Sequence, residues 1–368
     1  MKSKFLLIVL MMQSLSSLAN TDTTVLLSKA QQGDPQAQFD LAKYYEFTKA
    51  NNEALDFYIR SANQNNIQAI NKIASAYKNG KLGLSKNTAQ AIVWYKKSAN
   101  LGDSNSFNEI GKIHESIKGL GVGNYKILAR NAYVEGMNRH NPESAYRLGK
   151  LARELNQPEL ANDALFKAMK QNYPAAFSLM GDFNKEGFGR EQNFETAEFF
   201  YKRGADLNDP ASMHEYAKIL IFNKNDLANG LPLLEKAAAQ GYGRSYGLLG
   251  DLYHIQPEFP QLKDLTKAIT YYTHGVRLND AISAYNLAAL YSANYSDPKE
   301  YNTAYYSNEI NKLLEKAASL ENPQALMYFG DKYMNIDNSK AISYYERAAK
   351  SGSEVAKMKL RSLGRNVK

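Results

Sequence analysis

The residue types that most often carry chemistry are few and scattered in this sequence. The five histidines are His114, His140, His214, His254 and His274. They form no His-x-x-x-His or His-Glu-x-x-His pair, so a zinc site would need ligands from distant segments. Gly-x-Ser-x-Gly, which marks a nucleophilic serine, is also absent. The sequence therefore predicts no catalytic residue, no cofactor and no metal ion, and we expect a protein without enzymatic activity.

Two further patterns have a structural interpretation. Glu191, Glu195 and Glu198 fall where a helix should begin, and negative charge suits the helix dipole there. General acid–base catalysis would require two carboxylates in one cleft, which spacing alone does not show.

Glycine-rich stretches occur at 80–83, 119–123 and 187–189. None matches the phosphate-binding loop motif or follows a strand, so we interpret them as tight turns.

Tyrosine is abundant, with 26 residues, and it recurs at one fixed position. That position is occupied by Tyr45, Tyr77, Tyr253, Tyr291 and Tyr333, with His114 as its counterpart in another segment. Rings at this position could line a groove and contact a peptide or a carbohydrate. They could equally pack between helices as core, which we favour. The six residues are kept as candidate partner-binding residues.

A polar spacer at 296–307 contains a second group of tyrosines: Tyr301, Tyr305 and Tyr306. Insertions in repeat proteins often form loops on the binding face, so this spacer is a candidate contact site. A loop that is merely tolerated explains it equally well. A second long spacer, at 254–263, contains two prolines.

A repeated helical element must position these residues. In the stretch Ala91–Gly102, Ala91, Tyr95 and Ala99 are spaced i, i+4 and i+8, which places them on one helix face. A large ring between two small residues lets another helix approach closely. Gly102 is placed to end the helix.

This frame occurs nine times along the chain. Its central positions are 58, 95, 133, 165, 201, 234, 272, 314 and 345, at spacings of 31 to 42 residues. Leucine replaces the aromatic residue at 165, 234 and 314. A period of this length without β-type alternation is typical of a helical solenoid.

A second pattern predicts another helix before each frame. Positions 42, 74, 111, 149, 181, 217, 250, 288 and 330 are all Ala or Gly. Positions five residues earlier are all Ala or Ser. Prolines such as Pro35, Pro142, Pro174, Pro210 and Pro323 stand where these helices should begin, which suits a first helical turn.

The N-terminus reads as a secretory signal peptide over residues 1–19. Lys2 and Lys4 precede an apolar run of eight residues, and Ala19 supplies a small residue for cleavage before Asn20. The run is too short to span a bilayer, so we expect no stable membrane anchor. The chain has no cysteine, which excludes disulfides and an acylated lipoprotein N-terminus. We therefore expect a periplasmic or secreted protein.

The remaining chain reads as one array over residues 20–352, followed by a C-terminal cap over 353–368. Val355, Ala356, Met358 and Leu360 predict an apolar side for a final helix. The formal charge of +8 includes Lys2 and Lys4 of the leader. No run of five like charges and no stripe of arginines and aromatics occurs, so nucleic acid is not an expected partner.

The combined pattern resembles the Sel1-like repeat, a relative of the tetratricopeptide repeat. It reads Ala-x-x-x-Leu-Gly-x-x-Tyr followed by Ala-x-x-Trp/Tyr-Tyr-x-x-Ala-Ala-x-x-Gly, most clearly over 325–352, 69–102 and 176–205. The resemblance implies an all-α fold, a right-handed α-solenoid of about nine antiparallel helix pairs. It also implies a concave surface lined by the first helices.

The resemblance further implies a scaffold or adaptor that binds a protein partner, either in a bacterial envelope complex or on a host cell. Regulation of a membrane enzyme is one form of such a role. The alternative is a cell-wall protein that binds or processes glycan. Some secreted relatives carry a disulfide in each repeat, and the absence of cysteine sets this chain apart from them.

Overall fold

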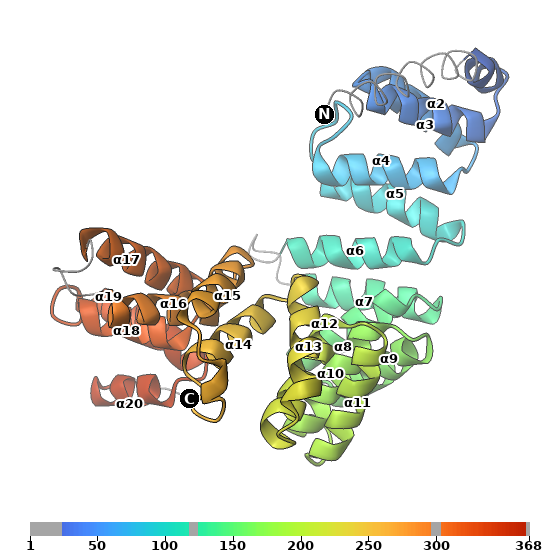
Figure 1. The fold of residues 1–368 in the computed structure, drawn as a ribbon. Coiled ribbons are helices and arrows are strands. Elements are labelled where there is room, and N and C mark those ends of the chain that lie inside the picture. The colour runs from blue at the N-terminus through green and yellow to red at the C-terminus, as the bar shows by residue number, and fades with distance from the viewer. Residues whose placement is uncertain (1–23, 118–123, 296–302, 366–368) are drawn as a thin grey trace, which may run out of the picture. The chain divides into compact units, whose positions relative to one another are not determined.

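A computed structural model describes residues 24–117, 124–295 and 303–365, and these are helical with no strand among them. The helices alternate as first and second members of successive antiparallel pairs (Figure 1). The first helices are α2 (Pro35–Phe47), α4 (Ile67–Asn79), α6 (Asn105–Ser116), α8 (Pro142–Glu154), α10 (Pro174–Glu186), α12 (Pro210–Lys218), α14 (Gly243–His254), α16 (Ala281–Asn294) and α18 (Pro323–Tyr333). The second helices are α3 (Asn51–Asn63), α5 (Thr88–Asn100), α7 (Tyr125–Asn138), α9 (Pro158–Lys170), α11 (Phe194–Asp206), α13 (Leu227–Ala239), α15 (Leu265–Arg277), α17 (Thr303–Ser319) and α19 (Asn338–Lys350).

Three more elements and a helical stretch over residues 24–31 complete the described chain. A π-helical turn, η1 (Ile219–Asn223), extends α12, and a 3-10 turn, η2 (Pro260–Leu262), lies in the long spacer after α14. The final helix is α20 (Glu354–Ser362). The predicted α-solenoid of about nine antiparallel helix pairs is thus confirmed for the described residues.

The chain divides into two compact units. Within the described residues, the first unit contains 24–180 and 188–191, and the second contains 181–187 and 192–365. Helix α10 begins in the first unit and ends in the second.

The second helices bury the central residue of each predicted frame. Tyr58, Tyr133 and Tyr272 are fully buried, and Leu165 and Leu234 take the same place in the repeats that lack the aromatic ring. The small residues at both first-helix positions are buried as well. The spacing in the sequence therefore identified the packing face of every repeat correctly.

Glycine in a first helix allows the tyrosine ring to lie directly on the backbone. A Cβ atom added to Gly250 would stand 2.4 Å from the Tyr272 ring, and one added to Gly330 would stand 2.3 Å from the Tyr345 ring. Real Cβ atoms do not approach this closely, so the ring occupies the volume that any side chain would need. These two positions require glycine for close helix approach.

The buried tyrosines also hydrogen-bond to an acid on the first helix. The hydroxyls of Tyr201, Tyr272 and Tyr345 donate to the aspartate that directly follows the small residue, at 2.7–2.8 Å. Those aspartates are Asp182, Asp251 and Asp331. In two repeats of the first unit the acceptor is a glutamate four residues after the small residue, Glu46 for Tyr58 and Glu115 for Tyr133. Each of these tyrosines thus connects the two helices of its repeat, through packing of the ring and through the hydrogen bond of the hydroxyl.

Each second helix is followed by a residue with positive φ, which turns the chain toward the next first helix. The residues at this position are Asn65, Gly102, His140, Asn172, Asn208, Gly241, Asn279, Glu321 and Gly352. Glycine and asparagine dominate because they tolerate left-handed backbone geometry best. The predicted role of Gly102 in ending its helix is confirmed, with φ of 103° directly after the C-cap Leu101.

Side-chain caps then start the first helices. Asp34, Asn141, Asp209 and Asn322 each accept a hydrogen bond from the backbone three residues on, and the predicted proline follows directly in each case. In α14, by contrast, the N-cap is Tyr242, which makes no side-chain capping bond.

The final helix differs from its prediction on one face. Ala356 and Leu360 are buried, but Val355 and Met358 are 52% and 58% exposed. Val355 directly precedes the small residue Ala356, a position that faces outward in the other first helices as well, as Ile282 does at 48% exposure. The predicted signal peptide over 1–19, the glycines at 119–123 and Tyr301 lie outside the described residues.

Candidate functional site

The tyrosine column predicted as a partner-binding surface lies between the two helices of each repeat. Tyr45 stacks on Phe57 at 5.7 Å, and Tyr253 stacks on Tyr271 at 5.5 Å. In both cases the second ring directly precedes the buried tyrosine of the second helix. Tyr253 is only 7% exposed.

The other members of the column pack similarly. Tyr77 lies in the apolar cluster that contains Trp94, and Tyr333 stacks on Tyr344 at 5.9 Å. Tyr291 contacts Tyr306 edge-on at 5.4 Å. These contacts favour the packing interpretation of the column, and contact with a partner through the same rings stays a prediction.

Of the remaining candidates, His114 is half-buried on α6, and its Nδ1 finds no hydrogen-bond partner among the residues that the structure describes. Burial, aided by Lys96, lowers the pKa of His114. At the start of α17, Tyr306 stacks on Tyr295 with 4.5 Å between the ring centres, while Tyr305 is 57% exposed. Among the candidate tyrosines that the structure describes, Tyr305 is therefore the most exposed.

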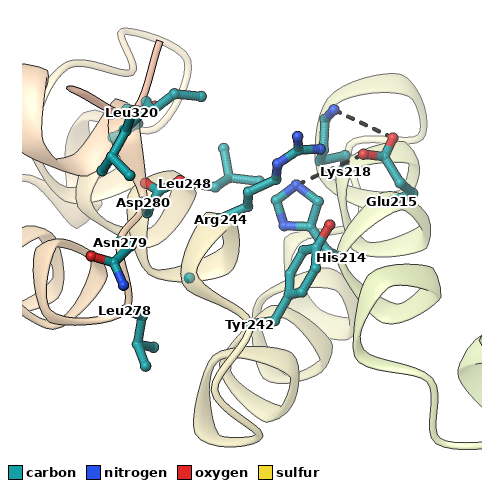
Figure 2. Close-up of a pocket in the computed structure, with 14 residues that line it drawn as sticks. His214, Glu215, Lys218, Tyr242, Arg244, Leu248, Leu278, Asn279, Asp280 and Leu320 are labelled. Carbon is teal, nitrogen blue, oxygen red and sulfur yellow. Dashed lines mark hydrogen bonds and ion pairs between the residues drawn. The ribbon is translucent and has the colours of Figure 1, made fainter. Parts of the chain in front are cut away.

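A cavity of about 500 Å³ lies in the second unit, and sequence reasoning did not identify it. It is lined by residues of α12 and α14, by the first turn of α16, and by the turns that precede α16 and α18. Figure 2 shows the α12 side chains His214, Glu215 and Lys218 on one side and Leu278, Asn279 and Asp280 on the other. Arg244 and Leu248 of α14 lie between them.

His214 is buried in the wall of this cavity, with 5% of its surface exposed. Its Nδ1 lies 3.1 Å from Ser245 Oγ, and its ring packs on Tyr242 with 5.3 Å between centres. Burial lowers the pKa of His214 to about 4. The imidazole is therefore neutral at pH 7 and adds no charge to the cavity.

Glu215 lies next to His214 and is held by two lysines. Its Oε2 accepts from Lys185 Nζ at 3.0 Å and lies 3.4 Å from Lys218 Nζ. Burial acts to raise the pKa of Glu215, but the two lysines outweigh burial and the pKa lies below its usual value. Glu215 is thus ionised at neutral pH and paired with the two lysines.

The two aspartates of the cavity also accept hydrogen bonds from neighbouring groups. Asp251 Oδ1 accepts from the Tyr272 hydroxyl and from Asn286 Nδ2, both at 2.7 Å, and burial raises its pKa. Asp280 caps α16, accepting from the backbone and the hydroxyl of Ser283 at 2.8 and 2.6 Å. Neither side chain is positioned as a free acid or base.

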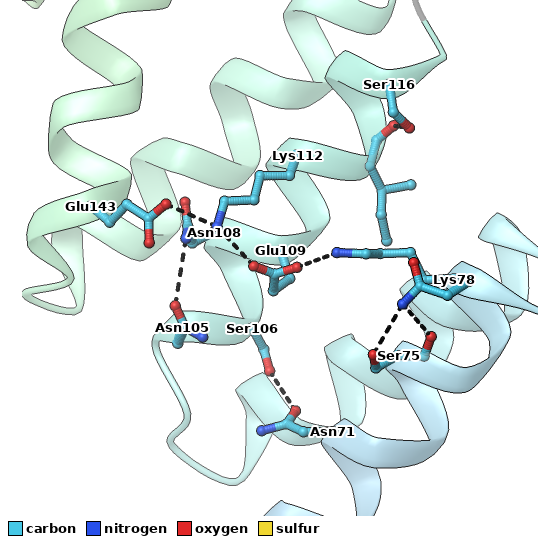
Figure 3. A network of polar contacts seen from close by, with 12 residues as sticks. Asn71, Ser75, Lys78, Asn105, Ser106, Asn108, Glu109, Lys112, Ser116 and Glu143 are labelled. Carbon is cyan, nitrogen blue, oxygen red and sulfur yellow. Dashed lines mark hydrogen bonds and ion pairs between the residues drawn. The ribbon is translucent and has the colours of Figure 1, made fainter. Parts of the chain in front are cut away.

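The first-helix surface of the first unit has a different character, because its charges pair with one another. Figure 3 shows Glu109 between Lys78 and Lys112, at 2.6 and 2.9 Å, and Lys112 continuing to Glu143 at 2.8 Å. Arg147 extends the series, with its Nε 2.9 Å from Glu143 Oε1. Opposite charges on successive repeats thus satisfy each other along α4, α6 and α8.

Two further observations concern metals and membranes. Among the described side chains, no three His, Asp or Glu residues are grouped so that they could hold a metal ion. Across the same ranges, every helix falls short of the length and apolar character that crossing a bilayer would require.

The fold defines a helical repeat solenoid protein, and comparison with known proteins identifies the repeat. The Sel1 repeat family model matches residues 35–66, 67–103, 169–209, 224–242 and 325–353. Two solved structures share the fold, each with a TM-score of 0.57 and 21% identity over 93% of this chain. One is a protective antigen present in uropathogenic Escherichia coli strains displaying an SLR fold, and 76% of it is covered. The other is a Sel1 repeat protein from Oxalobacter formigenes, with 91% covered.

A curated relative is an uncharacterized protein of Neisseria meningitidis serogroup B, 28% identical over 227 residues. The alignment covers 60% of this chain and 45% of the relative, so the chain spans about half the length of the curated relative it matches. The chain therefore carries five matched Sel1 repeats, on a fold that the two solved structures share.

Proposed function

We propose that this protein is a non-enzymatic, exported scaffold that binds a protein partner in the bacterial envelope or on a host cell. Solenoids present extended surfaces to other macromolecules, and Sel1 repeats typically mediate protein–protein interactions. The observation that carries the proposal is the exposure of apolar side chains on two first helices of the second unit and on its final helix. Ile282, Tyr328 and Val355 are 48%, 42% and 52% exposed on α16, α18 and α20.

Export rests on the N-terminal sequence, where two lysines, an apolar run and Ala19 form the pattern of a cleaved leader. The expected result is a mature chain that begins at Asn20 and is recovered from the periplasm or the medium. N-terminal sequencing of protein from each cell fraction tests this. Recovery of the chain from the cytoplasm with Met1 intact would contradict export.

Partner binding is tested by affinity capture of the tagged mature protein from its own envelope, with a mild crosslinker and mass spectrometry. The tyrosine column is unsuited to substitution here, since its rings pack within repeats. A variant with Ile282→Asp and Tyr328→Asp changes exposed first-helix residues instead. The control is Phe199→Asp, because Phe199 is 57% exposed on a second helix, α11.

We expect a defined protein to be captured by the wild type and by the control, and lost by the first-helix variant. Equal capture by all three proteins would place the contact elsewhere and remove the observation on which the proposal rests. Copurification of glycan without any protein would replace the scaffold with a cell-wall binding role.

A further inference from the structure

The cavity beside α12 and α14 contains a cation that has no carboxylate partner. Arg244 is exposed, and it forms no ion pair within the described part of the chain. Its guanidinium lies close enough to the Tyr242 hydroxyl to oppose the rise in the pKa of Tyr242 that burial causes. Figure 2 shows the Arg244 side chain extending from α14 into the space beside His214 and Lys218.

The acids that line the same cavity are already satisfied. Glu215 is shared by Lys185 and Lys218, Asp251 accepts two hydrogen bonds, and Asp280 caps α16. His214 is neutral at pH 7. Among the described residues that line the cavity, Arg244 is thus a positive charge without a carboxylate partner.

Apolar side chains lie next to this charge. Leu248, Leu278 and Ile282 line the cavity, and the last two are 43% and 48% exposed. Tyr285 follows Ile282 by three residues on α16, so the two share a helix face. Tyr285 lines a second cavity of about 550 Å³ together with Met327 of α18.

The two cavities thus follow one another along the first helices of the second unit. An extended polypeptide bound along both cavities would contact the Arg244 cation at one end and apolar side chains further along. The first-helix surface of the first unit differs around Glu109 and Glu143. There the cations Lys78, Lys112 and Arg147 are paired with these two glutamates.

We propose that this cavity binds an acidic side chain of the partner protein, presented on an extended segment. Its Asp or Glu carboxylate pairs with Arg244, and aliphatic side chains next to it lie against Leu248 and Ile282. Guanidinium and carboxylate groups can form two parallel hydrogen bonds, which fixes orientation as well as charge. The inference deepens the proposed scaffold function and rests on it.

A peptide-display selection tests the chemistry without knowledge of the partner. Random dodecapeptides fused through their C-terminal end to the displaying coat protein carry no free C-terminal carboxylate, so any carboxylate must come from a side chain. The selection is run on the immobilised full mature chain, on Arg244→Gln and on Arg203→Gln. Arg203 is a matched control because it is exposed on α11, forms no ion pair among the described residues and lies outside the cavity.

We expect the wild type and Arg203→Gln to enrich peptides in which Asp or Glu stands beside aliphatic residues, and Arg244→Gln to lose this enrichment. A selected peptide, made with an amidated C-terminus, should bind at least about tenfold more weakly when its acid is changed to the amide, or when Arg244 is changed to Gln. Circular dichroism verifies that both variants fold.

The inference is overturned if acidic peptides are not enriched, if enrichment persists in Arg244→Gln, or if the amidated peptide binds equally well after its acid is changed to the amide. A partner captured from the envelope equally by the wild type and by Arg244→Gln would also overturn it, while leaving the scaffold function intact. Loss of capture by the wild type itself would instead contradict the scaffold function.

Discussion

At the scale of single residues, the buried tyrosines of the second helices join the two helices of a repeat in two ways. The Tyr272 ring fills the space above Gly250, and its hydroxyl donates to Asp251. The ring supplies apolar contact area, and the hydroxyl satisfies a carboxylate whose pKa is raised by burial. Each part of this arrangement can be tested separately.

The ring contact is tested by Gly250→Ala. The added methyl group would overlap the Tyr272 ring, so the free energy of unfolding should fall by about 1–3 kcal/mol even though alanine favours helix. Urea unfolding measures the change. The double variant Gly250→Ala/Tyr272→Leu should recover part of the loss, because Ala217 with Leu234 and Ala288 with Leu314 occupy these places in other repeats. Additive losses in the double variant would contradict a direct clash.

The hydrogen bond is tested by Tyr272→Phe. Asp251 would keep Asn286 as a donor but lose the tyrosine, and we expect a loss of about 1–3 kcal/mol in the free energy of unfolding. Tyr253→Phe is the control, since its ring stacks on Tyr271 and no hydrogen bond of its hydroxyl occurs within the described residues. Equal effects of the two substitutions would show that the hydroxyl of Tyr272 has no special role.

The sequence predicted half of this arrangement. The small residue and the central aromatic ring each recur at a fixed spacing, so both columns could be recognised. The acid partner could not be recognised, because its distance along the sequence varies. The aspartate lies 19 residues before Tyr201, 21 residues before Tyr272 and 14 residues before Tyr345. One signal was nevertheless present: Gly is followed by Asp at 181–182, 250–251 and 330–331, in three repeats that have the central tyrosine.

The cavity was also beyond sequence reasoning, for a related reason. His214, Arg244 and Asp280 belong to three successive repeats, and no local spacing connects them. Each residue is ordinary in its own helix or turn. Only the packing of α12, α14 and the turn before α16 brings the three together.

At the scale of elements, the turns between repeats place one residue each in left-handed backbone geometry, which strains a residue other than glycine. His140 follows α7 with φ of 61°, where most other repeats have Asn or Gly. A side chain with a Cβ atom is disfavoured in this region, and the imidazole of His140 is exposed. The turn is therefore tolerated rather than optimal.

Replacement of His140 by glycine should stabilise the protein by about 0.5–1 kcal/mol, because relief of the left-handed strain exceeds the extra freedom that glycine gives the unfolded chain. Thermal unfolding measures the effect. His140→Ala removes the same imidazole but keeps the Cβ atom, and it should not raise the melting temperature. A rise with alanine equal to that with glycine would attribute the gain to loss of the ring and would contradict the strain argument.

At the scale of the whole molecule, the two units differ in the direction in which the pKa values of their acids are shifted. In the first unit, burial acts to raise the pKa values of Glu46, Glu109 and Glu143, but hydrogen bonds and nearby lysines outweigh it and all three pKa values are lowered. In the second unit, burial dominates at Asp182 and Asp251 and raises their pKa values. Lowered values also occur there, at Glu215 and Asp331, so the second unit contains both directions.

These shifts predict opposite contributions to stability in acid. A carboxyl with a lowered folded pKa stabilises the fold above its unfolded value, about 4.5 for glutamate, and that stability is lost as the pH falls through the folded pKa. A carboxyl with a raised folded pKa destabilises the fold when ionised, and this penalty disappears as the pH falls toward the unfolded value of 3.8. The first unit should therefore lose stability in acid sooner than the second.

Two local probes can separate the units. Trp94 is the single tryptophan and reports on the first unit, and Lys350→Cys introduces one labelling site on α19 into a chain without cysteine. Between pH 7 and pH 4, the urea midpoint reported by Trp94 should fall further than the midpoint reported by a dye at position 350. Asp251→Asn removes one acid of raised pKa, so in that variant the dye midpoint should fall more steeply with acid than in the wild type. A dye midpoint that falls as far as the Trp94 midpoint in the wild type would contradict the assignment, because the compensating effect of Asp182 and Asp251 would then be absent.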